Sequence, residues 1–353
     1  MARLRRVDCS GPGIRRRRHG RGFGYVDADG ARIDDPQVLA RIRALAIPPA
    51  WEDVWICPYP DGHLQATGTD VAGRKQYRYH DAWRTRRDAQ KFDDMVAFAH
   101  ALPALRERIA ADLGGCGALD RSCVLAAAVR LLEIGFFRIG SEEYAVENAS
   151  YGLATMRKEH VTIGQDGLMV FDYPAKSGQH RHQGIADPQL ARIVGALRRR
   201  RSGGPELLAY KARGRWHDVR SEDINAYLKE ATGGDFSAKD FRTWNATALA
   251  AVALAVSGAS ATTPTARKRA INRAVKEVAQ YLGNTPAVCR ASYIDPRVFD
   301  AFRAGLTIRP ALERVAQEVE PGELPIHQPE LEAAVLDLLD ERAGSGAIEK
   351  IAA

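Results

Sequence analysis

The sequence predicts an α+β protein: a small β-rich N-terminal domain followed by a larger, mainly α-helical domain with one short β-hairpin. The chain has 353 residues, 45% of them hydrophobic, which is enough for two domains of roughly 150 residues each. Apolar residues alternate in short runs between turn signals as far as His80, and from about Ala82 they recur with helical spacing. We therefore expect the domain boundary near residue 90.

The first domain is expected over residues 22–90. Residues 22–33 read as a hairpin around Asp29-Gly30, residues 35–44 as a short helix, and residues 54–80 as strands with turns at Asp61-Gly62 and near Gly73. Residues 1–21 contain a run of four arginines, Arg15 to Arg18, with glycines on both sides. Such a run is typical of a basic flexible arm.

The helical domain is expected over residues 91–320, and its elements begin and end at clear signals. An apolar helix starts near Asp120, and a strand over residues 161–173 returns through the turn 175–178 to about residue 185, with Lys176 at the tip. Ser237 and Asp240 form a capping box, which places Arg242 one turn inside a helix. Further helices start at Thr263-Pro264, Thr285-Pro286 and Asp295-Pro296, the first ending at Gly283. Residues 321–353 are expected to be a linker followed by an acidic C-terminal helix or tail.

The charge is unevenly distributed along the chain. The 51 basic and 44 acidic residues give a net charge of +7, with 17 basic against 11 acidic residues in residues 1–90 and 3 against 10 in residues 311–353. This balance favours a folded protein with a polyanionic partner. The sequence contains no run of 18 apolar residues and no apolar core in its Arg-rich beginning, so we expect a cytoplasmic protein without membrane association.

The cysteines are predicted to be reduced and mostly buried. They lie at positions 9, 57, 116, 123 and 289, without a CxxC pair or a ligand-like spacing to the nine histidines. This pattern argues against a disulfide framework and against structural zinc.

Five polar residues stand out, although each has an ordinary explanation when taken alone. Arg138 at the end of an apolar helix could complement the helix dipole, Lys176 could be a solvated turn residue, and Arg242 a salt-bridge partner. Asn284 could be a helix C-cap and Tyr293 a core aromatic. Their order, with nine positions from Asn284 to Tyr293 across a Thr-Pro helix start, is far more specific than any single member.

In this order the chain resembles the bacterial, poxvirus-like type IB DNA topoisomerases. The resemblance runs from about Gly22 to Gly305, and its signatures here are the segments 137–142 (FRIGSE), 239–243 (KDFRT) and 282–286 (LGNTP) followed by Tyr293. A further stretch, 73–79 (GRKQYRY), resembles the part of the family that contacts DNA beside the cleavage site. Tyrosine recombinases share the active-site plan, but they carry a histidine where this chain has Lys239, and a helical module usually precedes their catalytic domain.

The resemblance implies catalytic roles for five residues. Tyr293 would be the nucleophile, Arg138 and Arg242 would bind the scissile phosphate, and Lys176 would be the general acid. Asn284 stands where the family commonly has histidine and is assigned hydrogen bonding to a non-bridging oxygen only. DNA contacts are implied for Arg74, Lys75, Gln76, Tyr77, Arg78, Tyr79, Tyr144 and Lys239.

These residue types suit phosphoryl transfer. Planar, permanently charged guanidiniums match the equatorial oxygens of a phosphate under attack. A tyrosyl ester conserves the energy of the phosphodiester, and a proton donor is needed because the sugar hydroxyl is a poor leaving group.

The expected function is therefore ATP- and metal-independent relaxation of supercoiled duplex DNA through a 3′-phosphotyrosyl intermediate, by an isomerase that acts as a monomeric clamp in the bacterial nucleoid. No cofactor is expected to be required, and Mg²⁺ is expected at most to stimulate turnover. The alternatives are a site-specific tyrosine recombinase, which would act as a tetramer, and a catalytically inactive architectural DNA-binding protein.

Overall fold

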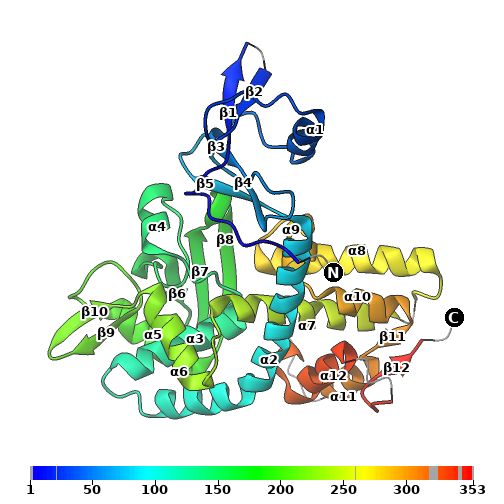
Figure 1. The fold of residues 1–353 in the computed structure, drawn as a ribbon. Helices are drawn as coiled ribbons and strands as arrows, with labels where there is room; N and C mark the ends of the chain where they lie inside the picture. The colour runs from blue at the N-terminus through cyan, green and yellow to red at the C-terminus, as the bar shows by residue number, and fades with distance from the viewer. Residues whose placement is uncertain (1–2, 21, 259, 318–324, 341–343, 352–353) are drawn as a thin grey trace. The chain divides into compact units, whose positions relative to one another are not determined.

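The protein was analysed as a computed structural model that describes residues 3–20, 22–258, 260–317, 325–340 and 344–351. The chain divides into two compact units, Met1–Lys91 and Phe92–Ala353, and α2 (Asp81–Gly114) starts in the first and continues in the second. An N-terminal sheet followed by a mostly helical region confirms the predicted α+β class (Figure 1). In the described ranges, no helix is both long and apolar enough to cross a membrane.

The first unit is a five-stranded antiparallel sheet with the order β2-β1-β3-β4-β5. Its strands are β1 (Ile14–His19), β2 (Gly22–Val26), β3 (Glu52–Ile56), β4 (Leu64–Thr69) and β5 (Lys75–Tyr79). The single helix, α1 (Pro36–Ala44), starts at Asp35, whose side chain accepts hydrogen bonds from the Gln37 and Val38 amides. Ile42 of α1 packs onto Ile14, Val54, Ile56 and Ala66.

The structure corrects the prediction for the arginine run. Arg15 to Arg18 lie in β1, which pairs with β2 on one side and with β3 on the other. The expected hairpin partner of residues 22–26 was the segment after Asp29-Gly30, but that segment contributes only an isolated bridge between Val26 and Arg32. The run forms a strand because its backbone pairs with β2 along its whole length and with β3 at Arg15, while the side chains project from the two faces of the sheet.

The second unit is built mainly from helices. After α2 they are α3 (Arg121–Gly135), α4 (Glu142–Asn148), α5 (Pro188–Arg199), α6 (Ser221–Thr232), α7 (Ala238–Gly258), α8 (Pro264–Leu282), α9 (Pro286–Ser292), α10 (Pro296–Arg303), α11 (Arg309–Val315) and α12 (Pro329–Leu339). A three-stranded sheet, β6 (Val161–Ile163), β7 (Leu168–Pro174) and β8 (His180–Ala186), contains the predicted hairpin with the 3₁₀ turn Lys176–Gly178 at its tip. Short 3₁₀ turns also occur at Lys158–His160 and Pro325–His327.

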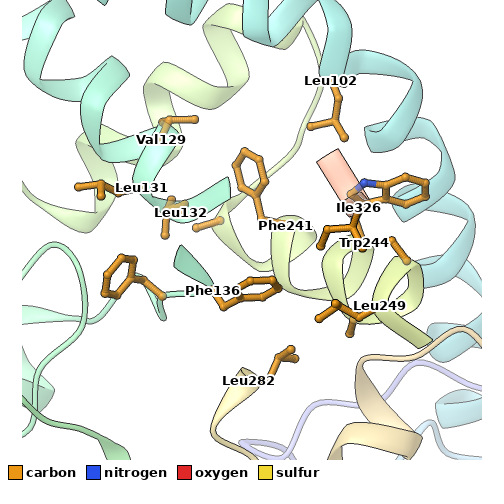
Figure 2. Packing of buried hydrophobic residues seen from close by; sticks show 14 of the residues in the cluster. Leu102, Val129, Leu131, Leu132, Phe136, Phe241, Trp244, Leu249, Leu282 and Ile326 are labelled. Carbon is orange, nitrogen blue, oxygen red and sulfur yellow. The ribbon is translucent and has the colours of Figure 1, made fainter. Parts of the chain in front are cut away.

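The centre of this unit is α7, because every residue from Phe241 to Ala251 is buried. Figure 2 shows Phe241, Trp244 and Leu249 of α7 among side chains of α2, α3 and α8. Small residues such as Ala246 and Ala250 let neighbouring helices approach this helix from several sides. The elements that carry the candidate site are therefore joined by one hydrophobic core.

Two short strand pairs were not predicted. Strands β9 (Ala209–Ala212) and β10 (Arg215–Asp218) form a hairpin around Arg213-Gly214, both with positive φ, and β11 (Leu306–Thr307) pairs with β12 (Glu349–Lys350). With four and two residues per strand, their alternation is too short to stand out from loop sequence.

The prediction that all cysteines are reduced is wrong for one pair. Cys116 and Cys123 form a disulfide with a Cα–Cα distance of 5.2 Å, which lies in the ordinary range for such bridges. Sequence spacing failed to reveal it because the approach depends on the turn between α2 and α3. Cys57 and Cys289 are free and buried, and Cys9 is free and half-buried.

The acidic C-terminal segment packs onto the helical unit. The expected linker falls partly on residues 318–324, which lie outside the described residues, and the expected amphipathic helix is α12. Leu331 and Val335 of α12 are fully buried. Arg106 of α2 donates to both carboxylate oxygens of Glu332 (2.7 and 2.6 Å) and to Glu133 of α3 (2.6 Å).

Candidate active site

Arg138 is held in a rigid loop that follows α3. The helix ends at Phe136, whose left-handed backbone (φ 53°) turns the chain away from the helix axis. The Leu153 amide donates to the Arg138 carbonyl (2.8 Å). Gly140 and Gly152 pack backbone to backbone, so that a Cβ added to Gly152 would lie 2.4 Å from the Gly140 nitrogen. Arg138 therefore projects from a fixed backbone and is not a free helix terminus.

Arg242 comes from the first turns of α7. Half of the predicted capping box forms: the Ser237 amide donates to the Asp240 carboxylate (2.8 Å), whereas the Asp240 amide donates to the Ser237 carbonyl and not to its hydroxyl. The Arg242 side chain is almost completely buried and donates to the carbonyls of Phe136 (2.8 Å) and Leu282 (3.0 Å). Its Nε has no hydrogen-bond partner among the described residues. Burial lowers the pKa of this guanidinium, which nevertheless stays charged because arginine starts far above neutrality.

Asn284 lies beside Arg138 where α8 ends. Gly283 closes the helix with φ 59°, and the Asn284 amide donates to the Ala279 carbonyl (3.0 Å). Arg138 Nη2 donates to the Gly283 carbonyl (3.0 Å) and to Asn284 Oδ1. This contact fixes the amide orientation and leaves the buried Asn284 Nδ2 as a donor without a partner.

Tyr293 ends the short helix α9 and faces Arg242. Thr285 caps the start of α9 by accepting from the Val288 amide (3.3 Å), and the Tyr293 amide donates to the Cys289 carbonyl (2.9 Å). The Arg242 Cζ atom lies 5.0 Å from the centre of the half-buried Tyr293 ring. Burial alone would raise the pKa of Tyr293, but the positive charges of Arg242, Arg138 and Lys239 outweigh it and lower that pKa. The site thus favours the phenolate, which is the nucleophilic form.

A cavity of about 320 Å³ joins these side chains. Its lining includes Arg138, Lys176, Lys239, Arg242 and Tyr293, and Asn284 is joined to this group through its contact with Arg138. Within the described residues, neither Arg138 nor Arg242 forms a salt bridge with a carboxylate. A buried or half-buried guanidinium without a counter-charge is unfavourable, and two of them line this cavity. The cavity is therefore expected to bind an anion strongly.

Comparison with known proteins assigns the family. Residues 80–308 match the catalytic core of eukaryotic DNA topoisomerase I, and residues 22–70 match the N-terminal domain of bacterial DNA topoisomerase IB. The chain is also 32% identical over 290 residues to a DNA topoisomerase 1B of Acanthamoeba polyphaga mimivirus, covering 80% of this chain and 85% of the relative.

The chain belongs to the type IB DNA topoisomerases. It is therefore an isomerase that acts on DNA, as the resemblance implied.

In this topoisomerase, the N-terminal residues with implied DNA contacts lie on or beside β5, the edge strand of the first unit. Tyr77 and Tyr79 are exposed on one face of β5, with ring centres 6.1 Å apart and nearly parallel rings. Arg74 and Gln76 instead bind Asp70 within the unit, at 2.9 Å each. Lys75 is exposed, and Arg78 is half-buried on the other face. The aromatic pair is thus exposed and, unlike Arg74 and Gln76, is not bound to Asp70.

Two other predicted residues are placed by their elements. Lys239 is exposed in the first turn of α7 and lines the cavity. Tyr144 falls in α4, and its side chain lies outside the part of the chain that the structure describes. Among the described residues, no group of three or more His, Cys, Asp or Glu side chains is placed to hold a metal ion.

Sequence reasoning missed Arg181, which ties the Lys176 hairpin to the end of α8. Arg181 of β8 donates to the carbonyls of Gln280 (3.0 Å) and Tyr281 (2.7 Å) and to the Gln183 side chain (3.0 Å). Together with Arg138 and Arg242, it also lines a small hollow behind the site. The polar return strand was visible in the sequence, but the partner of this arginine is 99 positions away.

Proposed function

We propose that this topoisomerase relaxes supercoiled duplex DNA by reversible transesterification of one strand to Tyr293, without ATP or a required divalent metal. The observation that carries the proposal is a pair of arginines that have no acidic partner among the described residues and that lie beside a tyrosine whose pKa is lowered. A scissile phosphate supplies the missing anion, and the phenolate supplies the nucleophile.

In the cleavage step, the Tyr293 oxygen attacks phosphorus and the bond from phosphorus to the 5′ oxygen breaks. The products are a 3′-phosphotyrosyl ester and a strand with a free 5′-hydroxyl. Arg138 and Arg242 hold the equatorial oxygens, and the unpartnered Asn284 Nδ2 donates to one of them. The reverse attack by the 5′-hydroxyl reseals the strand after the duplex has rotated. ATP is not needed because the ester conserves the bond energy.

Lys176 acts as the general acid in this proposal. It lies at the hairpin tip, is exposed, and lines the same cavity as Tyr293. An ammonium group there can protonate the departing 5′ oxygen, whose alkoxide is otherwise a poor leaving group. Lys239, on the same cavity, is the competing candidate. We further propose that one polypeptide acts on one duplex, because Arg138, Lys176, Arg242 and Tyr293 of the same chain already line one cavity.

The test is relaxation of a negatively supercoiled plasmid in EDTA without nucleotide. We expect full relaxation by the wild-type protein, and none by Tyr293→Phe, which removes only the nucleophilic oxygen. Denaturing the reaction with detergent should trap DNA covalently on the wild-type protein alone. Strict loss of relaxation in EDTA would contradict the proposal. Covalent capture of DNA by the Tyr293→Phe protein would mean that another residue, such as Tyr281, is the nucleophile.

A further inference from the structure

The register of the N-terminal sheet places alternate arginines of the Arg15–Arg18 run on opposite faces. Arg15 of β1 lies opposite Trp55 of β3, Trp55 opposite Thr67 of β4, and Thr67 opposite Tyr77 of β5. Directly opposed residues of an antiparallel sheet share a face, as do residues two apart on one strand. Arg15 and Arg17 therefore face the same side of the sheet as Tyr77 and Tyr79.

Arg16 faces the other side and is committed to the fold. Its guanidinium donates to the carbonyls of Pro48 (3.0 Å) and Trp51 and lies 4.1 Å from the centre of the Phe23 ring. Burial lowers the pKa of Arg16. Arg18 shares this face, opposite Phe23, and is exposed. Within the run, Arg16 therefore stabilises the fold, whereas Arg15, Arg17 and Arg18 are exposed at the surface.

Arg15 and Arg17 are exposed and take no part in a side-chain hydrogen bond or ion pair with any described residue. Two other exposed arginines of this unit do have acidic partners: Arg32 pairs with Asp34 (2.8 Å) and Arg74 with Asp70 (2.9 Å). The residue opposite Arg17 on β2 is Gly24, which places no side chain beside it. Two unpaired like charges on one sheet face repel each other slightly, and a polyanion would relieve this repulsion.

We propose that Arg15 and Arg17 bind backbone phosphates of the duplex that Tyr77 and Tyr79 face, with the N-terminal segment that covers Trp55 lying between the arginines and the tyrosines on this side of the sheet. This rests on the proposed function, in which duplex DNA is the substrate, and on the DNA contact that the resemblance implies for Tyr77 and Tyr79. Strands β1 and β5 are three inter-strand spacings apart, roughly 14 Å, close to the major-groove width of about 12 Å. At this distance the two tyrosines can lie at the groove while the two arginines contact the phosphates beside it. Trp55 lies between the arginines and the tyrosines, and its indole nitrogen donates to the Gly11 carbonyl (3.1 Å).

The test compares Arg17→Ala with Arg18→Ala, which remove the same charge from neighbouring positions on opposite faces. Duplex binding is measured against salt concentration in the full-length Tyr293→Phe protein, so that cleavage does not contribute. We expect Arg17→Ala to flatten the slope of log affinity against log salt by about 0.9, and Arg15→Ala with Arg17→Ala to flatten it by about 1.8. Arg18→Ala should keep the parent slope.

Equal slopes for Arg17→Ala and Arg18→Ala, or a parent slope for the double variant, would overturn the proposal. Thermal unfolding of each variant checks that the fold is kept, and Arg17→Gln, which retains more of the side chain than alanine, repeats the test with less loss of packing. A failure of the proposed chemistry would appear elsewhere, as loss of relaxation in EDTA or as covalent capture by Tyr293→Phe. Neither result depends on the salt slope.

Discussion

Lys176 and Arg242 line the same cavity, yet they differ in burial and in the part of the reaction that each would serve. Arg242 is 4% exposed and is held by two carbonyls, whereas Lys176 is exposed at a hairpin tip. A buried cation in a fixed position can stabilise the negative charge that develops on the non-bridging phosphate oxygens in the transition state. An exposed amine on a turn suits proton delivery to an oxygen that is leaving.

A substrate with sulfur in place of the bridging 5′ oxygen separates the two roles. Lys176→Ala should slow cleavage of normal DNA by about 10²- to 10⁴-fold, and most of that loss should vanish with the sulfur substrate, because a thiolate leaves without a proton. Arg242→Ala should stay slow with both substrates, since charge still develops on the non-bridging oxygens. The measurement is single-turnover cleavage. If the sulfur substrate rescued Lys239→Ala and not Lys176→Ala, the acid would be Lys239.

The lowered pKa of Tyr293 gives a second prediction at this scale. The positive charges of Arg242, Arg138 and Lys239 stabilise the phenolate form of Tyr293. The cleavage rate should therefore rise with pH and reach its plateau at a lower pH than it would with a tyrosine of ordinary pKa. Lys239→Gln removes one of these charges, which should raise the pKa of Tyr293 and move the rise in rate to higher pH. Single-turnover cleavage of the sulfur substrate measures this without the proton donor's contribution. A pH profile unchanged by Lys239→Gln would show that Lys239 does not act on the phenol.

Among the elements, α3 connects the active site to the C-terminal segment. Arg138 follows α3 directly, Asn245 of α7 donates to the Glu133 carbonyl (2.7 Å), and the Glu133 side chain binds Arg106 and Arg130. Arg106 in turn binds Glu332 of α12. The C-terminal helix thus supports the helix that precedes the candidate phosphate-binding loop.

Replacing Glu332 should test this support. Glu332→Gln leaves Arg106 with one carboxylate in a mostly buried position, which should lower the free energy of unfolding by about 2–3 kcal/mol. Glu330→Gln on the same helix is the matched control, because its pair with Arg314 is exposed and should contribute less than about 1 kcal/mol. Denaturant unfolding measures both. Equal effects would mean that the Arg106–Glu332 pair does not anchor α12.

At the scale of the whole molecule, the two units differ in how their charge is neutralised. Residues 1–90 carry an excess of basic residues, and several arginines of their sheet face lack acidic partners among the described residues. In the helical unit, the acidic C-terminal segment neutralises internal cations such as Arg106. Glu332 of the acidic C-terminal segment therefore serves packing.

Stability of the helical unit should fall in acid because of His327. The side chain is half-buried, both ring nitrogens are buried without a hydrogen-bond partner among the described residues, and their burial lowers the pKa of His327 to about 4, with Glu133 opposing the shift and Arg106 and Arg130 adding to it. Above about pH 6.5 the ring is neutral in both states. Between about pH 6.5 and 4 only the unfolded chain takes up the proton, so the free energy of unfolding falls as the pH falls.

His327→Leu should flatten this dependence by up to about 3 kcal/mol across the window. The same substitution at the exposed His100 should leave the dependence unchanged. Denaturant unfolding at a series of pH values provides the comparison. A His327→Leu protein that lost stability between pH 6.5 and 4 as steeply as the wild type would assign the acid sensitivity to other groups.

Local signals in the sequence determined most helix boundaries and the family. Asp35, Thr263, Thr285 and Asp295 mark helix starts because their side chains accept from the first free amides and each precedes a proline that fits the first turn. The order from Arg138 to Tyr293 pointed to the type IB topoisomerases because the chemistry requires those residue types. Such signals act over a few residues, and a sequence displays them directly.

Only the tertiary structure decided which distant groups meet. It placed the arginine run in an inner strand, joined Cys116 to Cys123, and buried Glu332 against Arg106. It also left Arg138 and Arg242 without acidic partners among the described residues, the feature that separates an anion site from an ordinary salt bridge. Strand partners and ion pairs depend on contacts across tens to hundreds of residues, and the local pattern of a strand or a charge does not encode its partner.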